Sequence, residues 1–473
     1  MSKEVNVSQI KKNMVVSVAA QVISLIVSFI MNLILPKYIS EYQYAYWQTY
    51  LLYVGYVGVF HFGLLDGILL RYSQYDYDEL DKPRIRSQFK CLLTITSAFS
   101  IVGIVSAGLF SHADMKIVFV FAAVGIIIRN LFTYTSYTFQ ITNRITKYAT
   151  MIISYRVFYG IVVTVMLLLG VKDFYWYCVA DLCSDMFGVF VGSFNNRGLY
   201  FGKSLQLRET ITELAENISS GIMLMAANWS SFLLTGSARL IIQWHWDELT
   251  FGKVSFSFSV TNLFLTFVMA ISVVLFPSLK RADPEKLPKL YKQIRDSISL
   301  LSIFVLVFYY PGCFILRKWL PAYNESLMYL GILLPLIVFT SKVSLLTNNY
   351  LMAYREEKKL LKINLLSVFV AVVVFAFCAY VLDNLTALII CIVGVLAFRS
   401  IVSELAVMKI IRLKGYFDFI VEIAMTAIFI VTAITLRPAM GLLAYSVALV
   451  VYFLIYRQTI MGLFRSICKR VKK

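Results

Sequence analysis

The sequence is dominated by long runs of apolar residues, each about as long as a helix that crosses a lipid bilayer. A transmembrane helix needs about 20 mainly apolar residues. Fourteen segments meet this requirement: 14–35, 45–70, 88–110, 116–139, 148–169, 174–194, 218–241, 250–279, 294–316, 327–352, 360–382, 386–408, 418–436 and 439–461. The runs lack the short alternation that marks barrel strands, and only helices otherwise satisfy the backbone in lipid. We therefore predict an all-α integral membrane protein with about 14 transmembrane helices.

The composition supports this fold class. Of the 473 residues, 60% are hydrophobic and only 15% are charged, whereas about 25% are charged in a typical soluble domain. The net charge of +18 would suggest nucleic acid in a soluble protein. Here the bases lie in short gaps between apolar runs, as in cytoplasmic loops that face anionic headgroups. We expect membrane lipid as a partner and no nucleic acid.

The distribution of basic residues predicts the topology. With the N-terminus in the cytoplasm, 32 of the 44 Lys and Arg residues fall in inner segments and 6 in outer segments. Cytoplasmic loops carry such an excess of Lys and Arg. Adding or removing one span would scramble the asymmetry, so we expect both termini to be cytoplasmic.

A long inner connection divides the chain near its middle. Lys12-Asn13 and Glu216-Asn217 each precede an apolar run that ends in a short aromatic outer turn. We interpret this recurrence as two parallel six-helix lobes, although any two membrane helices look alike to some degree. The predicted organisation is an N-lobe (1–195), an inter-lobe linker (196–217), a C-lobe (218–414), and two further helices with a basic tail (415–473).

Motifs for covalent chemistry are missing from the sequence. It contains no GxxxxGK[ST] phosphate loop, no HExxH and no Gly-x-Ser-x-Gly. The three histidines are far apart, and the seven cysteines have no metal-ligand or redox spacing. We therefore expect no catalytic residue, no metal and no cofactor, and we do not expect an enzyme.

Charged residues inside the predicted spans are the strongest functional signal, because a charge at the bilayer centre costs several kcal/mol. Six bases and five acids lie there: Arg129, Arg156, Arg239, Lys253, Lys342 and Arg399, with Asp66, Asp181, Asp185, Glu404 and Glu422. Arg129 and Arg399 are nearest mid-span, whereas we place Glu422 at the interface.

Helical spacing groups some of these charges. Arg129 begins a polar stripe with Thr133, Ser136 and Gln140, and Asp181 and Asp185 share one helix face. Structural ion pairing would explain any single one of these charges. Ion pairing alone does not account for all of these charges, because the bases outnumber the deep acids. This surplus of bases favours a cavity for an anionic substrate.

Two segments and the start of the chain carry a family resemblance. They are Lys12-Asn13 with Gln21, the segment 32–40 (NLILPKYIS) and the segment 61–72 (HFGLLDGILLRY). With the topology, they resemble the polysaccharide-transporter branch of the multidrug/oligosaccharidyl-lipid/polysaccharide exporter (MOP) superfamily, especially Wzx-type O-antigen flippases.

The resemblance implies a V-shaped, two-lobed transporter that works by alternating access in the bacterial inner membrane. The implied cargo is an anionic, undecaprenyl-diphosphate-linked oligosaccharide, an O-antigen or capsule repeat unit, moved to the outer leaflet. It also implies coupling to membrane potential or to an H⁺ or Na⁺ gradient. Related lipid II flippases carry key bases in spans one, two and eight, and only Lys253 matches that pattern here, loosely.

We expect Arg129 and Arg399 to contact the diphosphate or sugar acids centrally. Arg156 and Lys342 would serve an inward-open cavity, and Arg239 and Lys253 an outward-open one. The candidate coupling or gating acids are Asp66, Asp181, Asp185 and Glu404. We expect a monomer that works beside other polysaccharide-assembly proteins.

Three other functions remain open. A drug/cation antiporter of the same superfamily would need an acidic site in the N-lobe and an interior that does not repel cations. A membrane enzyme of envelope glycan assembly would turn over a lipid-linked glycan or a nucleotide sugar. A scaffold without a transport path would not need the surplus of buried bases.

Overall fold

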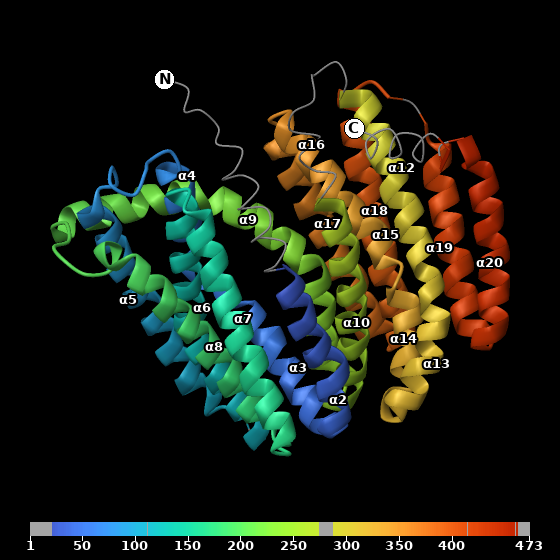
Figure 1. The fold of residues 1–473 in the computed structure, drawn as a ribbon, viewed down its shortest axis with the longest axis horizontal. Coiled ribbons are helices and arrows are strands. Elements are labelled where there is room, and N and C mark those ends of the chain that lie inside the picture. The colour runs from blue at the N-terminus through green and yellow to red at the C-terminus, as the bar shows by residue number, and fades with distance from the viewer. Residues whose placement is uncertain (1–20, 111, 274–286, 414, 459, 462–473) are drawn as a thin grey trace. The chain divides into compact units, whose positions relative to one another are not determined.

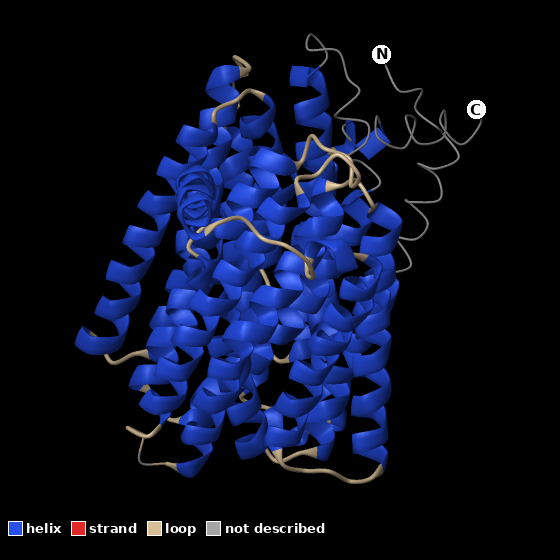
Figure 2. Cartoon of the chain, turned by 90° about the vertical axis from the view of Figure 1, so that its left-hand side faces the viewer, coloured by secondary structure: helices blue, strands red, loops and turns tan. Residues whose placement is uncertain are grey.

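The computed structural model describes residues 21–110, 112–273, 287–413, 415–458 and 460–461. Across these ranges every regular element is a helix, and no strand is present (Figure 2). Twelve of the described helices are long and apolar enough to cross a membrane, or thirteen when one bent pair counts as a single span. The all-helical membrane class predicted from the sequence is confirmed.

The chain divides between Trp229 and Ser230 into two compact units. The first unit begins with the helical segment Gln21–Tyr38, which ends in α2 (Leu35–Tyr38). The helices that follow it are, in chain order, α3 (Glu41–Gly55), η2 (Val57–His61), α4 (Leu64–Tyr72), α5 (Lys82–Ala107), α6 (Ala113–Ile141), α7 (Ile145–Leu168), α8 (Phe174–Asn195), η3 (Arg197–Leu199) and the start of α9 (Leu207–His245). Helix α6 contacts α3, α4, α5, α7 and α8, so it is the central helix of this unit (Figure 1).

The second unit contains the end of α9 and the remaining helices. These are α10 (Glu248–Val273), α12 (Leu287–Val305), α13 (Tyr309–Trp319), α14 (Ser326–Leu333), α15 (Leu336–Lys342), η7 (Val343–Thr347), α16 (Asn348–Ala353), α17 (Glu357–Ala376), η8 (Phe377–Val381), α18 (Leu385–Ile410), α19 (Phe417–Thr435) and α20 (Pro438–Ile455). The segment Ser326–Ala353, which covers α14 to α16, is the most deeply buried of the candidate spans. It contacts α10, α12, α18 and α19 and forms the core of this unit (Figure 1).

Many predicted spans correspond to one helix, but those at 294–316 and 327–352 are each divided into several consecutive helices, and residues 14–20 of the first span lie outside the described residues. The span predicted at 250–279 corresponds to α10, which ends at Val273, and residues 274–279 lie outside the described residues. The span predicted at 45–70 is bent by 57° between Glu41–His61 and Leu64–Tyr72. The predicted linker at 196–217 contains the first residues of α9, which continues unbroken to His245.

The bend has a local cause. Phe62 and Gly63 both adopt left-handed backbone conformations, with φ of +50° and +84°, and a helix cannot continue through such residues. Gly63 also lies close to α9, because a Cβ added there would come within 2.7 Å of the Ile222 backbone nitrogen. Only glycine combines that conformation with that approach.

The α4–α9 contact is equally close at the next turn. A Cβ at Gly67 would clash with the backbone of Asn217, and one at Gly221 would clash with Gly63 and Gly67. Small residues let the backbones of two helices approach in this way. The glycines of segment 61–72 therefore allow α4 to pack closely against α9.

We predict that Gly67→Ala destabilises the protein, because the new methyl group meets backbone that cannot rotate away. The expected loss is about 1–3 kcal/mol, measured as a lower unfolding temperature in detergent. Gly394→Ala is the matched control, since nothing lies within 4 Å of a Cβ at that helical glycine. Equal stability of the two variants would contradict the close packing described here.

Candidate functional site

In the first unit, three of the charges predicted inside the spans form one cluster. Arg129 on α6 lies between two carboxylates of α8: its Nη2 is 2.5 Å from Asp181 and its Nε is 2.8 Å from Asp185. Tyr50 on α3 donates a hydrogen bond to Asp181 at 2.8 Å. The four-residue spacing of the two acids places both on the face toward α6, so one guanidinium contacts both. Arg129 thus has the ion-pairing role that the sequence left open.

Arg156 on α7 differs from Arg129. Among the described residues it has no carboxylate within ion-pair distance, and its Nε is buried without a hydrogen-bond partner. Its guanidinium carbon lies 4.9 Å from the centre of the Tyr155 ring, a cation–π contact. Arg156 is therefore a base whose contact is an aromatic ring and not a carboxylate.

In the second unit, a larger ionic network joins four helices. Lys342, at the end of α15, is fully buried and forms ion pairs with Glu404 of α18 and with Glu422 of α19, the latter at 2.5 Å. Arg295 of α12 extends the network to Glu404 at 3.2 Å and to Asp418 at 2.6 Å. Buried charges persist only when they are paired in this way.

One member of this network was not recognised from the sequence. Arg295 lies at the start of the predicted span 294–316 but was counted with the bases of the inner connection, although it is only 5% exposed. Tyr291, Arg295, Ser299 and Ser302 repeat at helical spacing on α12 and are all buried, and this stripe was the available signal. Glu422, which we placed at the interface, is buried and paired with Lys342.

Arg399 on α18 is 4% exposed, yet it lies outside the ionic network. Its Nε donates to the side-chain oxygen of Asn364 at 3.0 Å, and its Nη2 donates to Ser231 at 2.7 Å. No carboxylate of the described chain lies within ion-pair distance. Arg399 is therefore a buried guanidinium with neutral partners.

Arg239 and Lys253 have individual partners. Arg239 donates to Ser255 at 3.3 Å, and its guanidinium lies 5.7 Å from the Phe251 ring centre. Lys253 forms a 2.7 Å ion pair with the exposed Glu325. Arg239 thus joins α9 to α10, and Lys253 joins α10 to the residue before α14.

Asp66 faces a histidine of the bent segment. Its Oδ2 lies 3.8 Å from Nε2 of His61, and both side chains are buried. The backbone N–H of Gly63 donates to Nδ1 of His61, which leaves Nε2 on the side of Asp66. Among the described residues, Asp66 therefore has His61 as its ion-pair neighbour and makes no ion pair with Arg129.

The end of the same segment carries a second network, at the start of α9. Arg71 contacts Glu213 at 2.5 Å, Glu216 at 2.6 Å and Asn217 at 2.7 Å, and Tyr72 donates to Glu213. Glu213 and Asn217 were not among the candidate residues. Arg71 belongs to the segment 61–72, which suggested the family resemblance, and Glu216-Asn217 suggested the internal repeat. The structure brings these two sequence features into contact.

Among the described residues, no three His, Cys, Asp or Glu side chains are placed to hold a metal ion.

No protein-family model matches the sequence, and no curated protein matches it. Solved structures do. The chain is similar to the lipid II flippase MurJ in an inward closed conformation, with a TM-score of 0.68, 10% identity, and coverage of 95% of this chain and 99% of that one.

Two multidrug resistance MATE family transporters of the MOP superfamily are also similar. An inward-facing one has a TM-score of 0.60 and 12% identity over 84% of this chain and all of its own. An outward-facing one has a TM-score of 0.57 and 15% identity over 85% of this chain and 96% of its own. The chain therefore shares its fold with these solved transporters.

We predict that Lys342→Met destabilises the protein by about 3–5 kcal/mol, because it leaves Glu404 and Glu422 buried with one cation fewer. The unfolding temperature in detergent measures the loss. Glu422→Gln added to Lys342→Met should restore part of it. The control is Lys359→Met, which removes an exposed i,i+3 pair with Glu356 and should cost less than about 1 kcal/mol. A Lys342→Met protein as stable as this control would rule out the pairing.

Proposed function

We propose that the protein is a flippase that moves an undecaprenyl-diphosphate-linked, anionic oligosaccharide from the cytoplasmic to the outer leaflet by alternating access. One observation carries this proposal: Arg156 and Arg399 have no carboxylate within ion-pair distance in the described part of the chain. The likeness in fold to a lipid II flippase supports the same class of cargo.

The chemistry of the two arginines suits a diphosphate. A guanidinium remains charged when buried and presents a planar fork of donors that matches phosphate oxygens. Arg129 and Lys342 are already paired with carboxylates, so we assign them to structural or gating roles rather than to direct cargo contact. Outward movement of an anion is favoured by an inside-negative potential, by about 2.3 kcal/mol per charge per 100 mV.

We place the protein in the bacterial cytoplasmic membrane with both termini inside, as a monomer beside other polysaccharide-assembly proteins. The excess of basic residues in alternate connections supports this orientation. We propose no covalent chemistry for it.

The second candidate is a multidrug/cation antiporter. The Asp181–Asp185 pair and the likeness to MATE transporters favour it. Arg129 lies against both acids, however, and a cationic drug would have to displace it. Unchanged drug susceptibility in a deletion strain would leave the flippase as the better function.

Arg399→Ala and Arg156→Ala should each reduce surface glycan at least tenfold when they replace the wild type in a deletion strain of the source organism. Removing a guanidinium that binds the diphosphate is worth about 1.5–3 kcal/mol per charged hydrogen bond. Arg399→Lys should retain part of the activity, because it keeps the charge but not the fork.

Arg317→Ala is the control, since it removes an exposed base at the end of α13. Immunoblots of membranes establish equal protein levels. If Arg156→Ala and Arg399→Ala both produce normal glycan at normal levels, the unpaired arginines do not bind the cargo.

The proposed orientation is tested by labelling single cysteines in a background without the native ones. Asp173→Cys, in the exposed connection between α7 and α8, should react with an impermeant maleimide in intact cells. Lys203→Cys, in the connection before α9, should react only after the cells are permeabilised. The reverse pattern would place the termini outside.

A further inference from the structure

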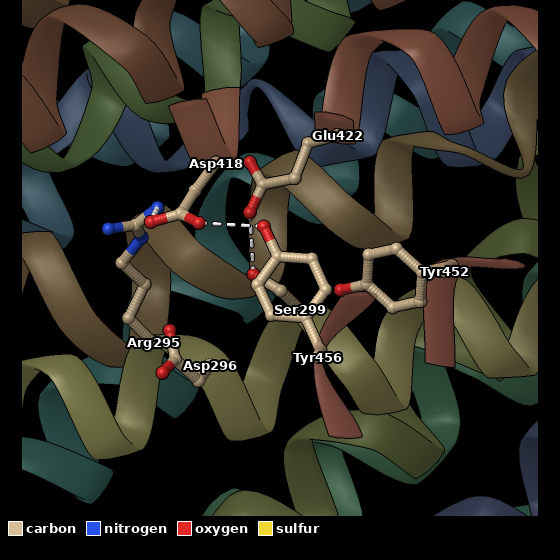
Figure 3. A pocket seen from close by; sticks show the side chains of 7 residues that line it. All are labelled: Arg295, Asp296, Ser299, Asp418, Glu422, Tyr452 and Tyr456. Carbon is tan, nitrogen blue, oxygen red and sulfur yellow. Dashed lines mark hydrogen bonds and ion pairs between the residues drawn. The ribbon is translucent and has the colours of Figure 1, made fainter. Parts of the chain in front are cut away.

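The second unit contains a pocket between α12, α19 and α20 that none of the proposed roles uses. Figure 3 shows the side chains around it. It is lined by Arg295, Asp296, Ser299, Asp418, Glu422, Tyr452 and Tyr456. Three of these are carboxylates and three are hydroxyls, so the pocket is rich in oxygen atoms.

Two of the three carboxylates are held by partners. Asp418 receives a hydrogen bond from Tyr456 at 2.6 Å and pairs with Arg295 at 2.6 Å. Glu422 receives a hydrogen bond from Ser299 at 2.6 Å, and Lys342 pairs with its other oxygen. Both acids therefore have hydrogen-bond donors and a basic partner for their oxygens.

Asp296 is the exception. It is only 8% exposed, it lines the pocket, and it makes no hydrogen bond or ion pair with any described residue. The hydroxyl of Tyr452, which also lines the pocket, has no hydrogen bond to the described residues either. A buried carboxylate without a partner is costly as an anion, because no donor replaces the lost water.

The charges that surround Asp296 oppose one another, because Arg295 and Lys292 favour its carboxylate form whereas Asp418 and Glu422 disfavour it. On its own helix, Arg295 is committed to Glu404 and Asp418, and Lys292, one turn earlier, is exposed. Helix α19 presents Asp418 and Glu422, and α20 presents only the tyrosines. With Glu404, the network holds four acids against the two bases Arg295 and Lys342, so one further positive charge would reduce a net negative charge.

A proton suits this arrangement better than a metal ion. In the described chain no three acidic, histidine or cysteine side chains converge as metal ligands. A proton needs a single oxygen, and protonated Asp296 becomes a neutral donor that can remain buried.

We propose that the pocket between α12, α19 and α20 is a proton-binding site, with Asp296 as the group that takes up the proton. The proton forms an O–H bond on one carboxyl oxygen, and no other bond changes. The binding itself stands independently of transport. Its use in coupling, by which a proton gradient would favour one conformation, rests on the proposed flippase function.

The test is the thermal unfolding of the purified full-length protein in detergent across a pH series. The wild type should lose stability as the pH rises, because deprotonation leaves an unpaired anion in the folded pocket and a hydrated one in the unfolded chain. Asp296→Asn should be more stable than the wild type at high pH and should lack this component of the pH dependence. Glu209→Gln, which neutralises an exposed acid of α9, should leave the profile unchanged.

A second variant covers the case in which Asp296→Asn does not fold. Lys292→Met removes the nearest exposed cation, so at low ionic strength it should shift the loss of stability to higher pH. Identical pH profiles for the wild type and the Asp296 or Lys292 variant would overturn the proton site. Stabilisation of the wild type by Na⁺ over K⁺ at constant pH, lost in Asp296→Asn, would also overturn it in favour of a metal ion.

A glycan assay separates this proposal from the proposed function. If Asp296→Asn lacks the pH-dependent component of stability while deletion of the gene leaves surface glycan unchanged, the proton site stands and the flippase function fails. If the deletion abolishes surface glycan while the stability profiles coincide, the flippase function stands and the proton site fails.

Discussion

The pairing of buried acids with basic side chains is the constraint on which the interior of both units depends. An ion in a low-dielectric interior is tolerated only when an opposite charge or several hydrogen bonds replace its hydration. In the first unit, Arg129 joins α6 to α8 through Asp181 and Asp185. In the second, Lys342 joins α15 to α18 and α19. These contacts help to determine which faces of these mainly apolar helices meet.

The pairing also separates structural charges from available ones. Once Arg129, Lys342 and Arg295 are assigned to acids, Arg156 and Arg399 are left with aromatic and neutral partners. Among the pocket's carboxylates, Asp296 is the one that forms no ion pair with a described residue. Such groups are costly inside a membrane protein, and we propose ligands for them: the phosphate of a cargo for the arginines and a proton for the carboxylate.

Several features were predictable because they depend on short sequence periods. The apolar runs predicted the helices, and the four-residue spacing of Asp181 and Asp185 predicted their common face. The bend at Phe62 and Gly63 was not predicted, because its cause is a pair of left-handed backbone angles next to α9. Arg295 was missed because it lies at the very start of the predicted span 294–316 and was counted with the inner bases, whereas α12 begins eight residues before it.

The sequence by itself determined the all-helical membrane class, the approximate number of spans, and the presence of charged residues inside them. These properties follow from local composition, since the cost of placing a residue in lipid depends mainly on its own side chain. Only the tertiary structure decided which base meets which acid. That choice joins residues far apart in the chain, such as Lys342 with Glu422 and Arg71 with Glu213. It depends on how helix faces pack, which no short stretch of sequence specifies.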